Sequence, residues 1–236
     1  MLNCDLHVHT IKSRCGYATA LEMINRAADL NLDAIAITDH GIFSGGYISH
    51  ALFRLPDVYR GVHIFKGVEV TVHDDPGKIG LPQKYLSKFH IILAGFHHKF
   101  DAENTPSNNT RYLIQYLHAH PYIDVISHPA IAKFPLDFDT LVPEAVKMGV
   151  AFEINNKNLK YNNTDIEYLK KMIDRNLDYG GKFVLNSDAH TVFELGEDEA
   201  IFSLLESYRS IPEETIINRT LESTIEFIEN RKHLKT

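Results

Sequence analysis

Histidine and carboxylate side chains stand at or just beyond the ends of six apolar segments of this chain. They are His7, His9, His40, Glu69, His97, His128, Asp188 and His190. Neutral imidazole nitrogens and carboxylate oxygens are ligands that suit zinc, iron and manganese. A carboxylate can also bridge two cations, which a single imidazole nitrogen cannot do, so Glu69 is the candidate bridge. The expected chemistry is that of a divalent metal cluster.

Local spacing within this set adds to the metal interpretation. His7 and His9 are two residues apart, as are Asp188 and His190, so each pair shares one face of an extended segment and can chelate one cation. A proline follows His128, which favours an extended backbone there and helps to fix the direction of the imidazole. Any one of these motifs alone also fits an ordinary turn, cap or core contact. Their recurrence at the ends of successive segments favours a metal site.

The apolar segments that carry these residues are predicted to be strands. They cover 3–8, 33–38, 62–70, 89–95, 123–127, 150–155 and 182–187, and runs such as DAIAIT are nearly continuous in apolar residues. Such runs are typical of parallel strands that are covered on both faces. Helices are expected between most of them. The expected ranges are 19–30, 107–118, 137–148, from about 164 to about 178, and one helix or a pair within 212–231. The segments 41–61 and 71–88 are expected to be loops or short helices.

The alternation of strands and helices predicts an α/β fold with a mainly parallel sheet. A closed barrel and an open doubly wound sheet both fit this pattern. In a barrel, active sites lie at the carboxyl ends of the strands, where the candidate ligands fall. Two helix starts carry the spacing of a capping box, namely Thr19 with Glu22 and Thr164 with Glu167.

Composition limits the classes of protein that fit. The chain has 236 residues and a net charge of -7, with no long run of lysine or arginine, which argues against a nucleic-acid partner. No apolar run approaches the roughly 20 residues of a membrane span, and MLNCDLHVHT does not resemble a secretory signal. A cytoplasmic protein is expected, in which Cys4 and Cys15 are reduced thiols. The length fits one domain.

Seven short motifs in a fixed order carry a resemblance to a known family. DLHVHT, ITDHG, GVEV, AGFH, ISHP, EINN and NSDAH resemble the polymerase and histidinol phosphatase (PHP) family, most closely its YcdX-like phosphatase branch. The resemblance implies a single-domain, distorted seven-stranded (β/α)7 TIM-like barrel with a trinuclear metal centre. The implied ligands are His7, His9, Glu69 and Asp188 for the first metal, Glu69, His97 and His128 for the second, and His40 and His190 for the third.

One position departs from the pattern of that branch. Cys15 stands where the branch usually has a histidine after the first strand. A thiolate is a good ligand for zinc or iron and a poorer one for manganese or magnesium. The third site is therefore expected to have an altered metal preference or to be weak, unless Cys15 is an ordinary loop thiol. The cofactors expected are up to three divalent ions of zinc, manganese or iron.

The expected function is hydrolysis of a small phosphomonoester by a metal-activated hydroxide, with Glu69, Asp188 and His128 as the catalytic residues. Three dications would outweigh their anionic ligands, so the site would attract an anionic, phosphorylated substrate. Two alternatives stay open, namely a phosphodiesterase or nuclease-like hydrolase and a noncatalytic metal-binding module. The branch includes oligomeric members, so a homo-oligomer is a further expectation, and no membrane partner is expected.

Several residues beside the expected ligands have candidate supporting roles. Asp5 could accept a hydrogen bond from the His7 ring, Asp39 could serve His40, and His98 could face the site because it adjoins His97. Four basic residues follow strand ends and could reach phosphate oxygens, although each also fits a solvated surface charge. They are Arg14, Lys99, Lys133 and Lys157.

Overall fold

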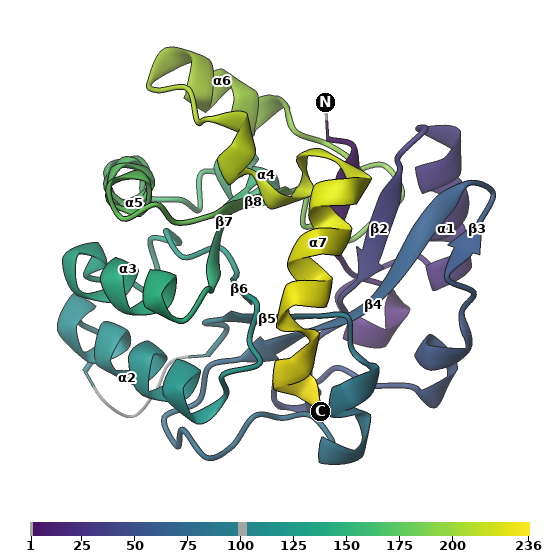
Figure 1. The fold of residues 1–236 in the computed structure, drawn as a ribbon, viewed down its shortest axis with the longest axis horizontal. Coiled ribbons are helices and arrows are strands. Elements are labelled where there is room, and N and C mark those ends of the chain that lie inside the picture. Colours follow the sequence, from purple (N-terminus) through teal and green to yellow (C-terminus); the bar gives the residue numbers. More distant parts are fainter. Residues whose placement is uncertain (1, 99–102) are drawn as a thin grey trace.

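The computed structural model describes residues 2–98 and 103–236. Within them, parallel strands follow one another around a ring in the order β1, β2, β4, β5, β6, β7, β8 (Figure 1). The strands are β1 (Cys4–Val8), β2 (Ala34–Ile37), β4 (Val62–Thr71), β5 (Ile91–Gly95), β6 (Val125–Ile126), β7 (Ala151–Asn155) and β8 (Phe183–Asn186). These match the seven expected strands. A short strand that was not expected, β3 (Val58–Tyr59), pairs antiparallel with β4.

The ring of strands closes nearly completely. β1 and β8 contact each other, and Val8 forms a parallel bridge with Ala189 just beyond β8. This arrangement confirms the barrel and rules out the open doubly wound sheet. The closure also brings the residues after β1 beside the residues after β8, which lie at opposite ends of the sequence.

The apolar strands are buried on both faces, as their composition predicts. In β2, Ala34 and Ala36 pack in one apolar cluster, which also takes side chains from β1, β5, β6, β7 and β8. Ile35 and Ile37 pack in a second cluster with Met23 of α1 (Ala20–Asp29). Cys4 lies in the first cluster, and both thiols are free of disulfides.

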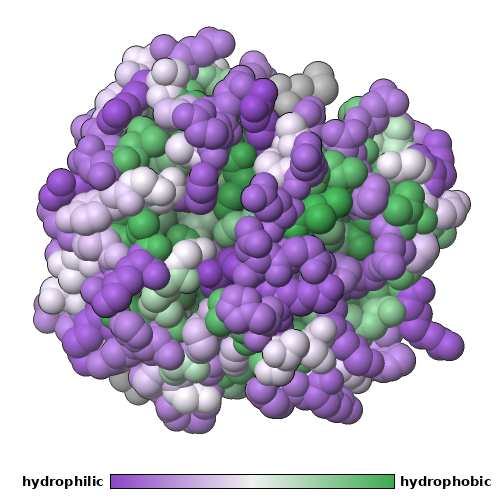
Figure 2. Space-filling model, in the orientation of Figure 1, coloured by the Kyte–Doolittle hydropathy of each residue, from purple (hydrophilic) through white to green (hydrophobic). Residues whose placement is uncertain are grey.

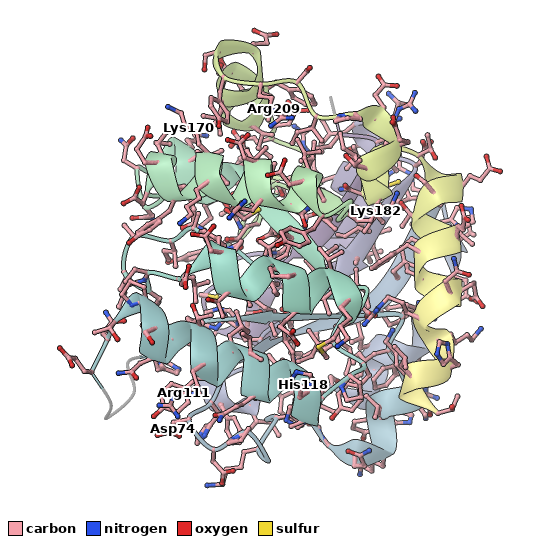
Figure 3. All side chains as sticks on the ribbon, turned by 60° about the vertical axis from the view of Figure 1, so that its left-hand side comes forward. Asp74, Arg111, His118, Lys170, Lys182 and Arg209 are labelled. Atoms are coloured by element: carbon pink, nitrogen blue, oxygen red, sulfur yellow. The ribbon has the colours of Figure 1, made fainter. Side chains whose placement is uncertain are left out.

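Helices cover the outside of the barrel, close to the positions expected. α2 (Pro106–Ala119), α3 (Phe138–Lys147) and α5 (Ile166–Asp178) lie side by side, as Figure 3 shows. Two of the cations labelled on this side are paired with acids: Lys170 lies 2.9 Å from Glu167, and Arg209 lies 2.7 Å from Asp174. In the part of the chain that is described, no helix combines the length and the apolar character that crossing a bilayer requires.

The helix ends confirm one capping prediction and correct another. Thr19 and Glu22 form the full capping box of α1. At α5 the N-cap is Asp165, not Thr164, and its carboxylate accepts from the backbone N–H groups of Glu167 and Tyr168. Asp and Thr are both good caps, so adjacent candidates leave the helix start ambiguous by one residue.

Two helices were not expected from the sequence. They are α4 (Asn156–Lys160), which follows β7 directly, and α6 (Glu199–Ser207). The segment 212–231 contains two 3₁₀ turns, Glu213–Thr215 and Ile217–Arg219, before α7 (Leu221–Arg231). Further 3₁₀ helices, Ile11–Ser13, Ile42–Ser44, His50–Arg54, Gln83–Lys88 and Lys232–Lys235, lie in the connections.

α7 covers the end of the barrel where the strands begin. It crosses in front of the ring of strands in Figure 1, and Figure 2 shows this face as largely hydrophilic with separate hydrophobic areas. Beneath it, the buried carboxylate of Asp124, just before β6, lies 2.8 Å from Arg231 Nε and 2.9 Å from Lys235 Nζ. The same carboxylate accepts from the backbone N–H of Ile92 at 2.8 Å. The opposite end of the barrel, where the strands finish, carries the candidate ligands.

Candidate metal centre

Glu69 lies at the centre of the candidate ligands. It is fully buried in β4, and its Oε2 lies 2.9 Å from His40 Nδ1 and 3.2 Å from His97 Nε2. The Nε2 atoms of His7 and His9 are 3.4 and 3.5 Å from the same oxygen. Burial disfavours the charged carboxylate, but these imidazoles outweigh it and hold the pKa of Glu69 well below its usual range. One anionic oxygen therefore faces four histidines.

A second acid, Asp188, closes the other side of the cluster. Its Oδ1 lies 3.4 Å from His9 Nε2, 3.5 Å from His190 Nδ1 and 3.7 Å from His7 Nε2. His128, which follows β6, reaches the other oxygen of Glu69, with Nε2 2.8 Å from Oε1. Strand ends far apart in the sequence thus deliver their side chains to one place, as a barrel requires.

Cys15 joins the cluster on the side of His190. Its sulfur and one ring nitrogen from each of His9, His40 and His190 all lie within 4.8 Å of one another. Burial raises the pKa of the thiol, but hydrogen bonds to His190 and His40 outweigh it and lower the pKa to about 6. A thiol with that pKa is mainly a thiolate at neutral pH, the form that binds metals. The structure thus places all nine candidate ligands together.

Unpaired polar atoms in the cluster fit a group of metal ions. His40 Nδ1, Glu69 Oε2, His97 Nε2 and Asp188 Oδ1 are buried. They lie close to one another, as Glu69 Oε2 does to His40 and His97, but none makes a hydrogen bond of good geometry with a described residue. A buried polar atom without a partner costs roughly 1–3 kcal/mol, so four that face one another need an explanation. Divalent ions between them would satisfy each one, because neutral imidazole and carboxylate are suitable ligands.

Hydrogen bonds on the far side of the His7 and His9 rings also fit metal binding. His7 Nδ1–H donates to Glu153 Oε1 at 2.7 Å, and His9 Nδ1–H donates to Ser13 Oγ at 2.9 Å. Each bond leaves a lone pair on Nε2, yet the two Nε2 atoms are only 2.9 Å apart. Two lone pairs at that distance repel each other unless a cation or a proton lies beside them. A carboxylate behind a metal-binding histidine is the usual arrangement.

Glu153, the first residue of the EINN motif, is a supporting residue whose role was not predicted. It is fully buried in β7, where it also accepts from the backbone N–H of His128 at 2.7 Å and from Asn186 Nδ2 at 2.7 Å. The expected partner of the His7 ring was Asp5, which is wrong. The carboxylate of Asp5 instead accepts from Ser187 and from the backbone N–H of Gly196. The β1–β2 register shifts between Asp5 and Val8, which breaks the simple alternation behind that expectation.

Glu153→Gln is expected to lower metal affinity about 10- to 100-fold, the range typical for residues that orient metal-binding histidines. The amide keeps the shape but loses the charge that fixes the His7 tautomer. Competition with a chelator of known affinity measures the change, and a thermal melt without metal checks the fold. Unchanged affinity in a folded variant would show that His7 does not need this carboxylate.

Asp39 supports His9 through the loop after β1. Its carboxylate accepts from the Ser13 hydroxyl at 2.6 Å and from the Thr10 hydroxyl at 2.8 Å. The Ser13 oxygen in turn accepts from the His9 ring and from the backbone N–H of His40 at 3.0 Å. Asp39 thus orients the His9 ring through Ser13. Its link to His40 also runs through Ser13, to the backbone N–H of His40 and not to the ring. No spacing rule links positions 10, 13 and 39, so this network required the folded loop.

The backbone at His128 differs from the expected extended form. Its φ is +34°, and Asp188 has a φ of +58°, so both occupy the left-handed region. Contacts of His128 with Glu69 and Glu153 outweigh the preference that the following proline imposes. Gly95 makes room for the ring, since a Cβ there would lie 2.6 Å from His128 Cε1.

A pocket of about 200 Å³ opens onto the cluster. Lys133 and Lys157 line it, together with His9, His40, Glu69, His97, His128, Asp188 and His190. Of the other two predicted phosphate-binding cations, Arg14 does not line this pocket, and Lys99 lies outside the part of the chain that the structure describes. His98 turns to the loop after β2, where its Nε2–H donates to the Phe43 carbonyl at 3.2 Å.

Comparisons with known proteins agree with this geometry. Residues 5–185 match the PHP domain. A probable phosphatase of Acetivibrio thermocellus is 34% identical over 232 residues, covering 97% of this chain and 95% of the relative. The probable phosphatase YcdX of Escherichia coli O127:H6 is 33% identical over 236 residues, covering 98% and 96%.

The fold is also similar to that of a solved structure. The crystal structure of histidinol phosphate phosphatase from Lactococcus lactis, complexed with zinc, L-histidinol and phosphate, has a TM-score of 0.59. The identity is 14%, and the match covers 87% of this chain and 93% of that one, so this likeness concerns the fold. The domain match spans most of the chain, and relatives above 30% identity cover nearly all of it. The chain therefore belongs to the PHP domain family.

Proposed function

We propose that this protein is a metal-dependent phosphatase that hydrolyses a small phosphomonoester at a cluster of up to three divalent ions. The observation that carries the proposal is the convergence of unpaired, buried nitrogen and oxygen atoms beneath one pocket. The relatives named as probable phosphatases support the reaction class. The zinc and phosphate held by the histidinol phosphate phosphatase are in keeping with the ligand types found here.

We assign the ligands to three groups. His7, His9, Glu69 and Asp188 would hold the first ion, and Glu69, His97 and His128 the second. His40, His190 and Cys15 would hold the third. Ligand atoms of His7, His9 and Glu69 lie within 4.8 Å of one another, as do those of His40, Glu69 and His97, which supports Glu69 as a shared ligand.

Bound ions would supply Lewis-acid chemistry, by acidifying a water molecule and offsetting charge on the phosphoryl oxygens. The protein's own groups would do the positioning. Asn155 Nδ2–H donates to Asp188 Oδ2 at 3.2 Å, which leaves Oδ1 facing the cluster and able to orient the attacking water. Glu69 would fix the spacing of two ions. His128, whose Nε2 lies beside Oε1 of Glu69, would complete the ligands of the second ion.

The charge of the site favours a dianionic substrate. Three dications, with a charge of +6, would exceed the -3 of Glu69, Asp188 and a Cys15 thiolate. The protein as a whole carries a net charge of -7, but the bound ions would make the potential at the pocket positive. A confined charge of this kind attracts nearby anions despite the opposite net charge.

The test of this function combines elemental analysis with a substrate panel. Protein purified without chelator should contain bound zinc, manganese or iron and should hydrolyse p-nitrophenyl phosphate faster than bis(p-nitrophenyl) phosphate. Removal of metal should abolish turnover, and adding it back should restore turnover. A preference for the bis-ester would favour the phosphodiesterase alternative. Bound metal without turnover on a broad panel of phosphate esters would favour the noncatalytic alternative.

Cys15→Ser is expected to lower the bound metal by about one equivalent, because a hydroxyl is a poor replacement for a thiolate at a zinc or iron site. Elemental analysis of matched preparations measures the change. Cys4→Ala is the control, since Cys4 is buried in an apolar cluster and should leave the metal content unchanged. Full stoichiometry in the Cys15 variant would make this thiol a bystander.

A further inference from the structure

Lys157 is a cation of the pocket wall that the ligand groups leave without a role. It lies in α4, directly after β7, and its side chain is 27% exposed. The helix is anchored beside the cluster, because the Asn155 side chain caps it while contacting Glu153 and Asp188. The backbone N–H of Lys157 donates to the Ser187 carbonyl at 3.3 Å. The side chain therefore starts from a fixed point at the edge of the pocket.

The ammonium group of Lys157 has no acid of its own. Among the described residues, its one ion-pair partner within 4 Å is Asp188 Oδ1, at 3.8 Å, and that oxygen also faces the cluster. Lys160, three residues further along the same helix, differs clearly, since its Nζ lies 2.9 and 2.7 Å from the two oxygens of Glu197. The charge of Lys160 is neutralised on the surface, whereas the charge of Lys157 is directed to the pocket.

The contact of Lys157 with His190 would not survive metal binding at that histidine. Nζ lies 2.8 Å from Nδ1 and 3.3 Å from Nε2 of the ring. His190 Nδ1 is also 2.9 Å from the Asp188 carbonyl, and when it donates there, only Nε2 can accept from the ammonium. A metal ion on Nε2 would remove this last acceptor and repel the ammonium group. Lys157 would then need an anionic partner in the pocket.

We propose that Lys157 is a substrate-binding residue whose ammonium group binds a nonbridging oxygen of the phosphoryl group beside the metal centre. This inference rests on the proposed function and names a protein cation that acts on the substrate together with the ions. Lys133 lines the same pocket from the loop after β6, so the phosphoryl group would meet positive charge from more than one side. The same contact would hold the phosphate product.

The test measures the binding of inorganic phosphate to metal-loaded protein by calorimetry, independently of turnover. Lys157→Gln is expected to weaken phosphate binding about ten- to a hundredfold, the usual effect of losing a hydrogen bond to a charged group. Lys157→Arg should recover most of the affinity, because it keeps the charge. Lys160→Gln is the control on the same helix and should bind phosphate like the wild type. Metal content should be equal in all four proteins.

Other results would overturn the inference. Phosphate affinity unchanged in Lys157→Gln, or no phosphate binding by the metal-loaded wild type, would exclude this role. A gain of bound metal in Lys157→Gln with unchanged phosphate affinity would show that the ammonium group competes with an ion instead. Phosphate binding that depends on Lys157, in a protein that hydrolyses no ester of the panel, would uphold this inference while overturning the proposed function.

Discussion

Glu69→Gln is expected to lower kcat/KM for p-nitrophenyl phosphate by about 10³-fold or more. The amide cannot supply the anionic oxygen that faces His7, His9, His40 and His97. If Glu69 bridges two ions as proposed, its loss would forfeit several kcal/mol of charge stabilisation by them, and each ~1.36 kcal/mol is a factor of ten in rate. Steady-state kinetics and elemental analysis on the same preparation measure the two effects together.

The control for Glu69 must leave the cluster intact. Glu167→Gln alters an exposed acid on α5 that pairs with Lys170, and it should keep full metal content and turnover. A Glu69 variant that loses metal yet turns over the whole substrate panel at the wild-type rate would contradict the metal-dependent mechanism. Near-normal metal content with lost turnover would instead limit Glu69 to a role in the reaction itself.

Asp124→Asn is expected to destabilise the fold by about 3–5 kcal/mol, the usual result of removing one partner from a buried ion pair. Arg231 and Lys235 would then remain buried, at 6% and 3% exposure, without their counterion. Urea unfolding followed by circular dichroism measures the free energy of unfolding. The candidate metal centre lies at the other end of the barrel, so the folded fraction should keep its specific activity.

An exposed network of the same composition provides the comparison for Asp124. Asp139 lies 2.6 Å from Lys171 Nζ and 2.5 Å from Arg175 Nε, and all three side chains are 40–45% exposed. Asp139→Asn should destabilise the fold far less than Asp124→Asn, because solvent screens such exposed pairs. Equal losses in the two variants would mean that burial does not decide the strength of the Asp124 network. Lys235→Met, which removes one cation, gives a milder case if Asp124→Asn does not fold.

The sequence predicted the barrel strands well because parallel strands covered on both faces are almost wholly apolar. β5, Ile91–Gly95, is an example in which every residue is buried. The helices with clear caps were also found, such as α1 with its capping box. α6 was missed, although Asp198 is a residue type that often caps a helix, and the structure shows no side-chain capping bond from it. α4 was missed because it begins with no break after β7.

The gathering of the candidate ligands could be predicted, since the carboxyl ends of barrel strands meet at one rim. Their supporting contacts could not. Glu153 opens the EINN motif in the middle of a strand segment, but the motif gave it no role, and only the fold shows that its carboxylate lies behind His7. Ser13 and Asp39 meet only through the path of the loop after β1. At His128, tertiary hydrogen bonds decide a backbone conformation that the local proline rule assigns differently.

The seam between the first and last strands has a thermodynamic consequence. His9 and Cys15 lie just past β1, whereas His190 lies just past β8, and their ligand atoms come together across the bridge from Val8 to Ala189. An ion held by Cys15 and His190, as in the proposed third group, would cross-link the first and last strands of the barrel through coordination bonds. Its binding free energy would add directly to that of barrel formation, because an unfolded chain offers no such assembled site. Ion affinity and resistance to unfolding are therefore linked at this position.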